Sequence, residues 1–154
     1  MIIINKRNLF FLISVWLLST LLSAQNVTIS TPHTQLLLSV PNGGTPEQLY
    51  YGSRTSDADI RSICETARRR NAYPVYGMVY PCETALSVRH ADGNLTLQMA
   101  VIGVKETRLT KENATLTVIE LKDKVYPFFV NICYKAWQDA DVIETWTEIR
   151  HEEK

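Results

Sequence analysis

The sequence has little cysteine and no excess of charge of either sign. It holds three cysteines, Cys64, Cys82 and Cys133, so an oxidising compartment could close at most one bridge and would leave one thiol free. A disulfide scaffold is therefore excluded, and buried single thiols are the simpler interpretation because free cysteine behaves as a small apolar residue. Lysine plus arginine equals aspartate plus glutamate, 16 of each, so no net field exists to attract nucleic acid or an anionic membrane.

Long apolar runs are absent except for one at the start of the chain. Lys6 and Arg7 precede an apolar run over residues 9–22, and two small residues follow it. This order predicts a secretory signal peptide over residues 1–24, because the run is shorter than the roughly 18 to 20 residues that a membrane-spanning helix needs. We therefore expect an exported protein, periplasmic or secreted, with no membrane contact after cleavage. About 130 residues would then remain over 25–154, enough for one domain with a real core.

The common signatures of metal, cofactor and nucleophile sites are missing. His33, His90 and His151 lie far apart in the sequence, and no close pair of cysteine or histidine has the spacing of a zinc site. There is no Gly-x-Ser-x-Gly elbow. The PNGGTP segment at residues 41–46 is a turn between prolines and does not open a helix, so it is no phosphate-binding loop. We expect no metal, no cofactor and no catalytic residue in this chain.

The remaining chain consists mainly of short runs typical of β-strands. Asp92-Gly93 is the strongest hairpin signal. The spacing of runs and turns is typical of an antiparallel sandwich or barrel. We expect strands within residues 26–40, broken at Pro32, and at residues 48–52, 83–90, 95–101, 114–121, 126–137 and 141–150.

In one segment the spacing of apolar residues changes from that of a strand to that of a helix, which predicts a single short helix. Apolar residues at 60, 63, 64 and 67 fall on one helical stripe. Ser56 and Asp59 form a capping box at its start. The three arginines at residues 68–70 follow at its other end, where cations would complement the macrodipole. The arginine run therefore has a structural explanation.

Residues 71–82, NAYPVYGMVYPC, crowd aromatic residues and prolines into a short span. We interpret this segment as a structural corner in which Tyr73, Tyr76 and Tyr80 pack, with hydroxyl partners for those that are buried. The prolines punctuate the chain just ahead of the expected hairpin.

Carboxylates are plentiful, but no pair suits glycoside cleavage from spacing alone. Glu144 and Glu148 share one face of the strand expected over residues 141–150, yet four residues separate them by roughly 13 Å. Glycosidases need two carboxyl groups roughly 5 to 9.5 Å apart. The aspartates stand at the expected helix start or in turns, where they cap the backbone.

Trp146 lies between those two glutamates on the same face, and two interpretations of the three residues stay open. Trp146 with Glu144 and Glu148 could contact a sugar, or Trp146 could be the buried anchor of a contact with another domain. We favour the domain contact because the last strand runs almost to the end of the chain, which suggests an incomplete sheet with an open edge.

Three segments in order carry a family resemblance: YYGSR at residues 50–54, NAYPVYGMVYPCETALSVRHADGNLTLQM at 71–99, and IELKDKVYPFFVNICYKAWQDADVIETWTEI at 119–149. Together they resemble the N-terminal β-sandwich domain of glycoside hydrolase family 36, the α-galactosidases, in exported enzymes of Bacteroidetes. The resemblance implies part of a supersandwich, similar to galactose mutarotase, with one helical insertion.

In that family the N-terminal domain precedes a (β/α)8 barrel, which carries both catalytic aspartates. The resemblance thus implies a non-catalytic portion of an α-galactosidase, inactive alone, whose partners are an α-galactoside oligosaccharide and the barrel, with a homo-oligomer as a further expectation. The alternative is a free-standing carbohydrate-binding or oligomerisation module. No functional residue of the family carries over to a position in this chain.

Overall fold

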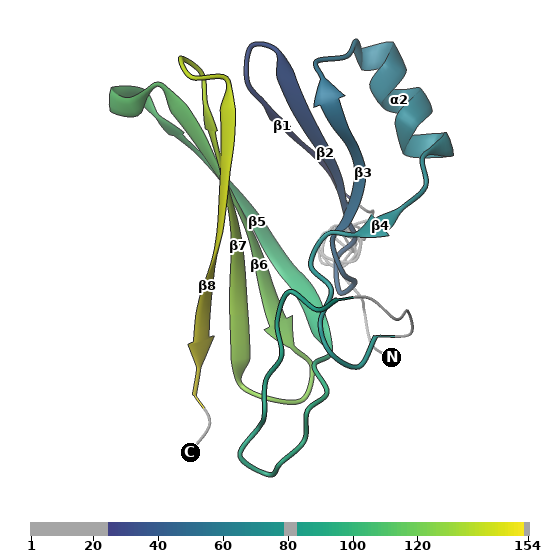
Figure 1. Cartoon of the computed structure of the whole chain (residues 1–154), viewed down its shortest axis with the longest axis vertical. Helices are drawn as coiled ribbons and strands as arrows, with labels where there is room; N and C mark the ends of the chain where they lie inside the picture. Colours follow the sequence, from purple (N-terminus) through teal and green to yellow (C-terminus); the bar gives the residue numbers. More distant parts are fainter. Residues whose placement is uncertain (1–24, 79–82, 153–154) are drawn as a thin grey trace, which may run out of the picture.

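The structure is a computed structural model that describes residues 25–78 and 83–152. It is an antiparallel β-sandwich in which two four-stranded sheets enclose one core (Figure 1). The signal peptide expected at residues 1–24 lies outside the described residues, as do Tyr80 and Cys82. In the described part of the chain, no helix is long and apolar enough to cross a membrane.

The first sheet has the order β1-β2-β3-β4. Pro32 lies between β1 and β2, which confirms the expected break, because proline cannot donate a ladder hydrogen bond. The inner strand β2 is buried along nearly its whole length, with Leu37 and Leu38 almost fully enclosed. The four strands are Gln25–Ser30, Thr34–Val40, Glu47–Ser53 and the short Arg70–Asn71.

The helix α2 (Asp57–Thr66) begins where the sequence predicts. The Ser56 side chain accepts from the backbone N–H of Asp59, and the Asp59 carboxylate accepts from the backbone N–H of Ser56, so the capping box is complete. The helix lies beside β3, on the side of the first sheet that faces away from the second (Figure 1).

The expected role of the three arginines at the helix end is wrong. The helix ends at Thr66, Ala67 caps it in an extended conformation, and its last turn carries no basic residue. Arg69 instead donates to the hydroxyl of Ser39 at 3.1 Å and to the carboxylate of Glu47 at 2.9 Å. The arginine therefore ties the segment after the helix to the first sheet.

The second sheet is a meander with the order β5-β6-β7-β8. Its inner face follows from simple alternation: in β7 the residues Phe128, Val130, Ile132, Tyr134 and Ala136 are all buried in the core. Its strands are Met99–Leu109, Ala114–Asp123, Phe128–Trp137 and Val142–His151, and the 3-10 turn η1 (Thr110–Glu112) joins the first two. The alternate residues form the outer face, which carries the candidate site.

The hairpin expected over residues 83–101 is wrong as a pair of strands. Its turn forms, with Gly93 at a φ of +87°. Next to the turn, His90 donates to the carbonyl of Asn94 at 2.8 Å, but farther along each arm bonds to the corner at residues 71–78, and residues 99–101 belong to β5. Ala85 donates to the carbonyl of Pro74 at 2.8 Å, and Leu97 donates to the same corner at 3.1 Å. Tertiary pairing with the corner thus replaces local hairpin pairing.

The tyrosines of the corner differ in their surroundings. Tyr73 is buried, and burial raises the pKa of its hydroxyl, an effect partly offset by a hydrogen bond with Thr147 of β8. Tyr76 is 49% exposed, so the expectation that it packs is wrong. The corner therefore contributes one buried tyrosine that reaches the second sheet.

Asp141 joins the two sheets at one end of the sandwich. Its Oδ1 accepts from the Thr31 hydroxyl and, at 3.1 Å, from the backbone N–H of His33, both in the turn between β1 and β2. The Thr31 hydrogen bond, with that of His33, lowers the pKa of the Asp141 carboxyl below its ordinary value. A depressed folded-state pKa stabilises the fold above the ordinary carboxyl pKa and loses this contribution as the pH falls below it.

We expect Asp141→Asn to be less stable than the wild type near neutral pH, with a difference that shrinks as the pH falls below about 4. Asparagine keeps an acceptor oxygen and tolerates the positive φ of 55° at this position, so the charge is the main change. Urea denaturation across that pH range measures the difference. Glu65→Gln on the exposed helix surface is the matched control, and a difference that stays constant with pH would contradict the prediction.

Candidate functional site

The three residues singled out on the last strand lie on the outer face of β8, but they do not form one site. The indole N–H of Trp146 donates to Glu148 at 3.3 Å, and Glu144 accepts from the indole of Trp137 at 3.0 Å. Trp146 is half-buried. Glu148 alone of the three lines a groove in the sheet surface.

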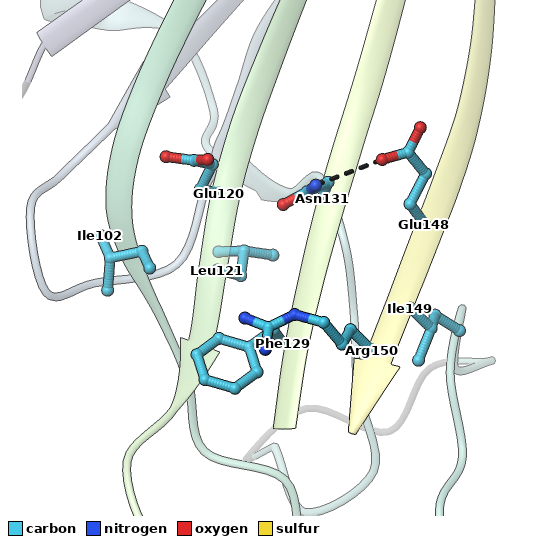
Figure 2. A pocket seen from close by; sticks show the side chains of 8 residues that line it. All are labelled: Ile102, Glu120, Leu121, Phe129, Asn131, Glu148, Ile149 and Arg150. Atoms are coloured by element: carbon cyan, nitrogen blue, oxygen red, sulfur yellow. Dashed lines mark hydrogen bonds between the residues drawn. The ribbon is translucent and has the colours of Figure 1, made fainter. Parts of the chain in front are cut away.

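The groove has a volume of about 410 Å³ and lies near the end of the second sheet where β8 ends (Figure 2). Its upper row consists of Glu120, Asn131 and Glu148, which stand opposite one another on β6, β7 and β8. The amide of Asn131 donates to the Glu148 carboxylate at 3.2 Å. The remaining lining residues are Ile102, Leu121, Phe129, Ile149 and Arg150. Strand register therefore assembles three hydrogen-bonding side chains in line.

A glycine and a bulge on β5 make room for Glu120. The register of β5 and β6 shifts between Val101 and Gly103, and Gly103 then pairs with Glu120. A Cβ at Gly103 would lie 2.8 Å from the Glu120 carboxylate, which would have to move aside. Lys105 on the same strand holds the carboxylate at 2.5 Å.

The lower row of the groove is a stacked cation on an aromatic ring. The guanidinium of Arg150 lies 3.9 Å from the ring centroid of Phe129, as Figure 2 shows, and the ammonium of Lys122 lies 5.7 Å from the same centroid. Arg150 also donates to Glu152. Ile102 forms the apolar side of this row and is 56% exposed.

The two carboxylates of the groove do not suit glycoside cleavage. Glu120 and Glu148 flank β7, so two strand spacings, roughly 9.5 Å, separate their backbones. Cleavage requires one carboxyl group to donate a proton. Here both serve as acceptors: Glu120 from Lys105, and Glu148 from Asn131 and Trp146. Both carboxylates are thus already engaged with neighbouring side chains of the sheet.

Other reactive side chains of this sheet are enclosed. Cys133 is buried on β7 opposite Trp146, and burial, with the charge of Glu148, raises the pKa of its thiol. Burial raises the pKa of the Tyr134 hydroxyl to about 12. A thiol with a raised pKa is a poor nucleophile. Across residues 25–78 and 83–152, no group of three or more metal-ligating side chains is present.

The sequence alone pointed to Glu148 and missed Glu120, Asn131 and Arg150. Each of these residues is ordinary within its own strand, and only the register between strands brings them together. Their outward positions, alternating with core residues, are the sequence signal that could have placed them on one face.

Comparison with known proteins gives one family match and several similar structures. The glycosyl hydrolase family 36 N-terminal domain matches residues 44–154. No curated protein sequence matches the chain. Among solved structures, the α-galactosidase of Lactobacillus brevis aligns with a TM-score of 0.69 and 15% identity, over 82% of this chain and 21% of that protein.

Two further solved structures show the same fold. The family 36 α-galactosidase AgaA of Geobacillus stearothermophilus, in complex with 1-deoxygalactonojirimycin, aligns with a TM-score of 0.73 and 14% identity, over 84% of this chain and 22% of that one. The galactosidase domain of the α-galactosidase-sucrose kinase AgaSK aligns with a TM-score of 0.66 and 21% identity, over 82% and 22%. The chain thus spans about a fifth of the length of the solved proteins that it matches.

Proposed function

This chain belongs to the family of glycosyl hydrolase family 36 N-terminal domains, and on that premise we propose that it is the leading, non-catalytic part of an exported α-galactosidase. The full protein would hydrolyse terminal α-linked galactose from oligosaccharides without a cofactor. The observation that carries this proposal is the family match over residues 44–154, supported by a fold shared with α-galactosidases. Export is part of the proposal because the sequence predicts a signal peptide over residues 1–24.

In this proposal the sandwich is a scaffold beside a catalytic barrel. A retaining glycosidase works with two carboxyl groups roughly 5 to 5.5 Å apart, one of them protonated when it acts as the acid. The two glutamates of the groove, Glu120 and Glu148, stand on strands that flank β7, and their carboxylates accept from Lys105 and Asn131. The barrel would supply the acid and the nucleophile.

We expect the chain of 154 residues to show no hydrolysis of an aryl α-galactoside, whereas the longer gene product that includes a barrel should hydrolyse it in the exported fraction. Release of the aryl group measures both. The matched control is the longer product with Glu65→Gln, which should keep its turnover number because Glu65 lies exposed on α2, away from the groove. Turnover by the short chain that a point change in it abolishes would refute the proposal.

A further inference from the structure

The groove on the outer face of β5 to β8 offers hydrogen-bond donors and acceptors side by side. Carboxylate oxygens of Glu120 and Glu148 accept, while the amide of Asn131 and the guanidinium of Arg150 donate. A sugar hydroxyl both donates and accepts, and two neighbouring hydroxyls match the two atoms of a planar carboxylate, amide or guanidinium. A row of such groups therefore fits a sugar better than it fits a purely apolar ligand.

The charges around the groove are already balanced, which favours a neutral ligand. Lys105 neutralises Glu120, and Glu152 pairs with Arg150. Glu148 accepts from two uncharged groups, Asn131 and Trp146. Lys122, over the Phe129 ring, is the third cation of the region. Three carboxylates thus stand against three cations, with Glu148 the third carboxylate. An anion would meet two carboxylates in the lining, and a cation would meet Arg150 and Lys105. A neutral polyhydroxyl compound meets neither penalty.

The lining is held in place before any ligand arrives. Glu120, Asn131 and Glu148 stand on three neighbouring strands with continuous pairing at these positions. Gly103 leaves the Glu120 carboxylate its place, and Lys105 fixes it. Side chains on rigid strands lose less freedom when a ligand binds than side chains on loops do.

We infer that this groove is a non-catalytic binding site for a neutral oligosaccharide. Its volume of about 410 Å³ lies within the range of small-molecule sites, roughly 300 to 1,000 Å³. Arg150 stacked on Phe129 forms the floor of the lower row, and the three side chains of the upper row bind hydroxyls. Galactosides are the first choice of ligand because of the proposed function, on which that choice alone rests.

Saturation-transfer NMR with stachyose tests the site on the chain at low concentration. The wild type should transfer saturation to the sugar, and Glu148→Gln and Asn131→Ala should each weaken binding about tenfold through lost hydrogen bonds. Gly103→Ala should weaken it as well, because its Cβ displaces the Glu120 carboxylate. Glu112→Gln is the matched control, since Glu112 pairs with Lys135 beyond the other end of the sheet.

Maltotetraose and sulfate separate the ligand classes. Binding of maltotetraose that the same variants weaken supports a neutral-sugar site and removes its preference for galactosides. Binding of sulfate in place of both sugars overturns the inference. Stachyose binding that Glu148→Gln and Asn131→Ala leave unchanged also overturns it. So does the absence of saturation transfer to either sugar at ~10 mM, a concentration well above a millimolar Kd. Loss of binding here would leave the activity test of the full-length protein unaffected, so the two proposals fail separately.

Discussion

Replacing Asp123 by alanine is expected to lower the free energy of unfolding by about 3 to 5 kcal/mol, among the largest effects of any single change in this chain. Asp123 is 1% exposed at the end of β6. Its carboxylate accepts three backbone N–H groups, from Gln98 at 2.6 Å, Val125 at 2.7 Å and Tyr126 at 2.9 Å. Alanine would leave all three donors without this partner in a site closed to water.

Asp123 also ties together two segments that continue from the end of the β5–β6 ladder, where Asp123 pairs with Met99. The residue closes the turn from β6 to β7, and through Gln98 it fixes the irregular segment that leads into β5. Lys124 adds a backbone bond of 3.1 Å to the carbonyl of Gln98. Loss of the carboxylate therefore loosens both the turn and the segment.

Asp123→Asn is the matched variant for this prediction. One acceptor oxygen survives and can keep the two bonds in the turn, but the amide NH2 then faces the N–H of Gln98. We expect its free energy of unfolding to lie between that of the wild type and that of the alanine variant. Urea unfolding followed by circular dichroism and by tryptophan fluorescence measures it. An alanine variant within about 1 kcal/mol of the wild type would contradict the role of Asp123.

Three strands of the second sheet were predictable from sequence, most clearly β7, whose core residues alternate with outer ones. The strand expected at 114–121 is observed as Ala114–Asp123, and the one at 141–150 as Val142–His151. The capping box at Ser56 likewise placed the start of α2. Each of these signals is local, so no knowledge of distant contacts was required.

The later part of β5 and the arms of the hairpin were not predictable from local pattern. Residues 83–98 alternate as strands do, yet Ala85 and Leu97 donate to carbonyls of the corner at residues 71–78. The outer part of β5, up to Leu109, carries mostly exposed and charged residues and so lacks the apolar alternation that indicates a strand. Pairing with β6 along its length makes it a strand.

The groove could not be predicted because it depends on register between strands. Glu120, Asn131 and Glu148 belong to three strands, and a shift of one residue in either pair would turn one of them toward the core. The bulge before Gly103 depends equally on pairing. The sequence offered only Glu148, through its place beside Trp146.

The second large effect concerns the edge of the second sheet. Within the described residues β8 pairs with β7 alone, without a register shift over its ten residues. The opposite edge strand, β5, is interrupted by its bulge. A bulge blunts an edge, whereas a straight edge offers free backbone groups to another chain. We therefore expect the chain, expressed alone, to self-associate through β8 and to have poor solubility.

Ile149→Lys should shift the chain from associated species toward the monomer. Ile149 is 50% exposed on β8 and points to the same face as Ile143, so a lysine there places a charge on the core side of the edge strand, where pairing with a second copy would bury it. Val125→Lys makes the same change at a residue 64% exposed in a turn, and should leave association unchanged. Size-exclusion chromatography with light scattering over a range of concentrations measures the mass. A wild-type monomer with a sharp two-state melt would count against association. Because only Ile149 lies on β8, an equal effect of both lysine substitutions would mean that net charge, and not the strand edge, controls association.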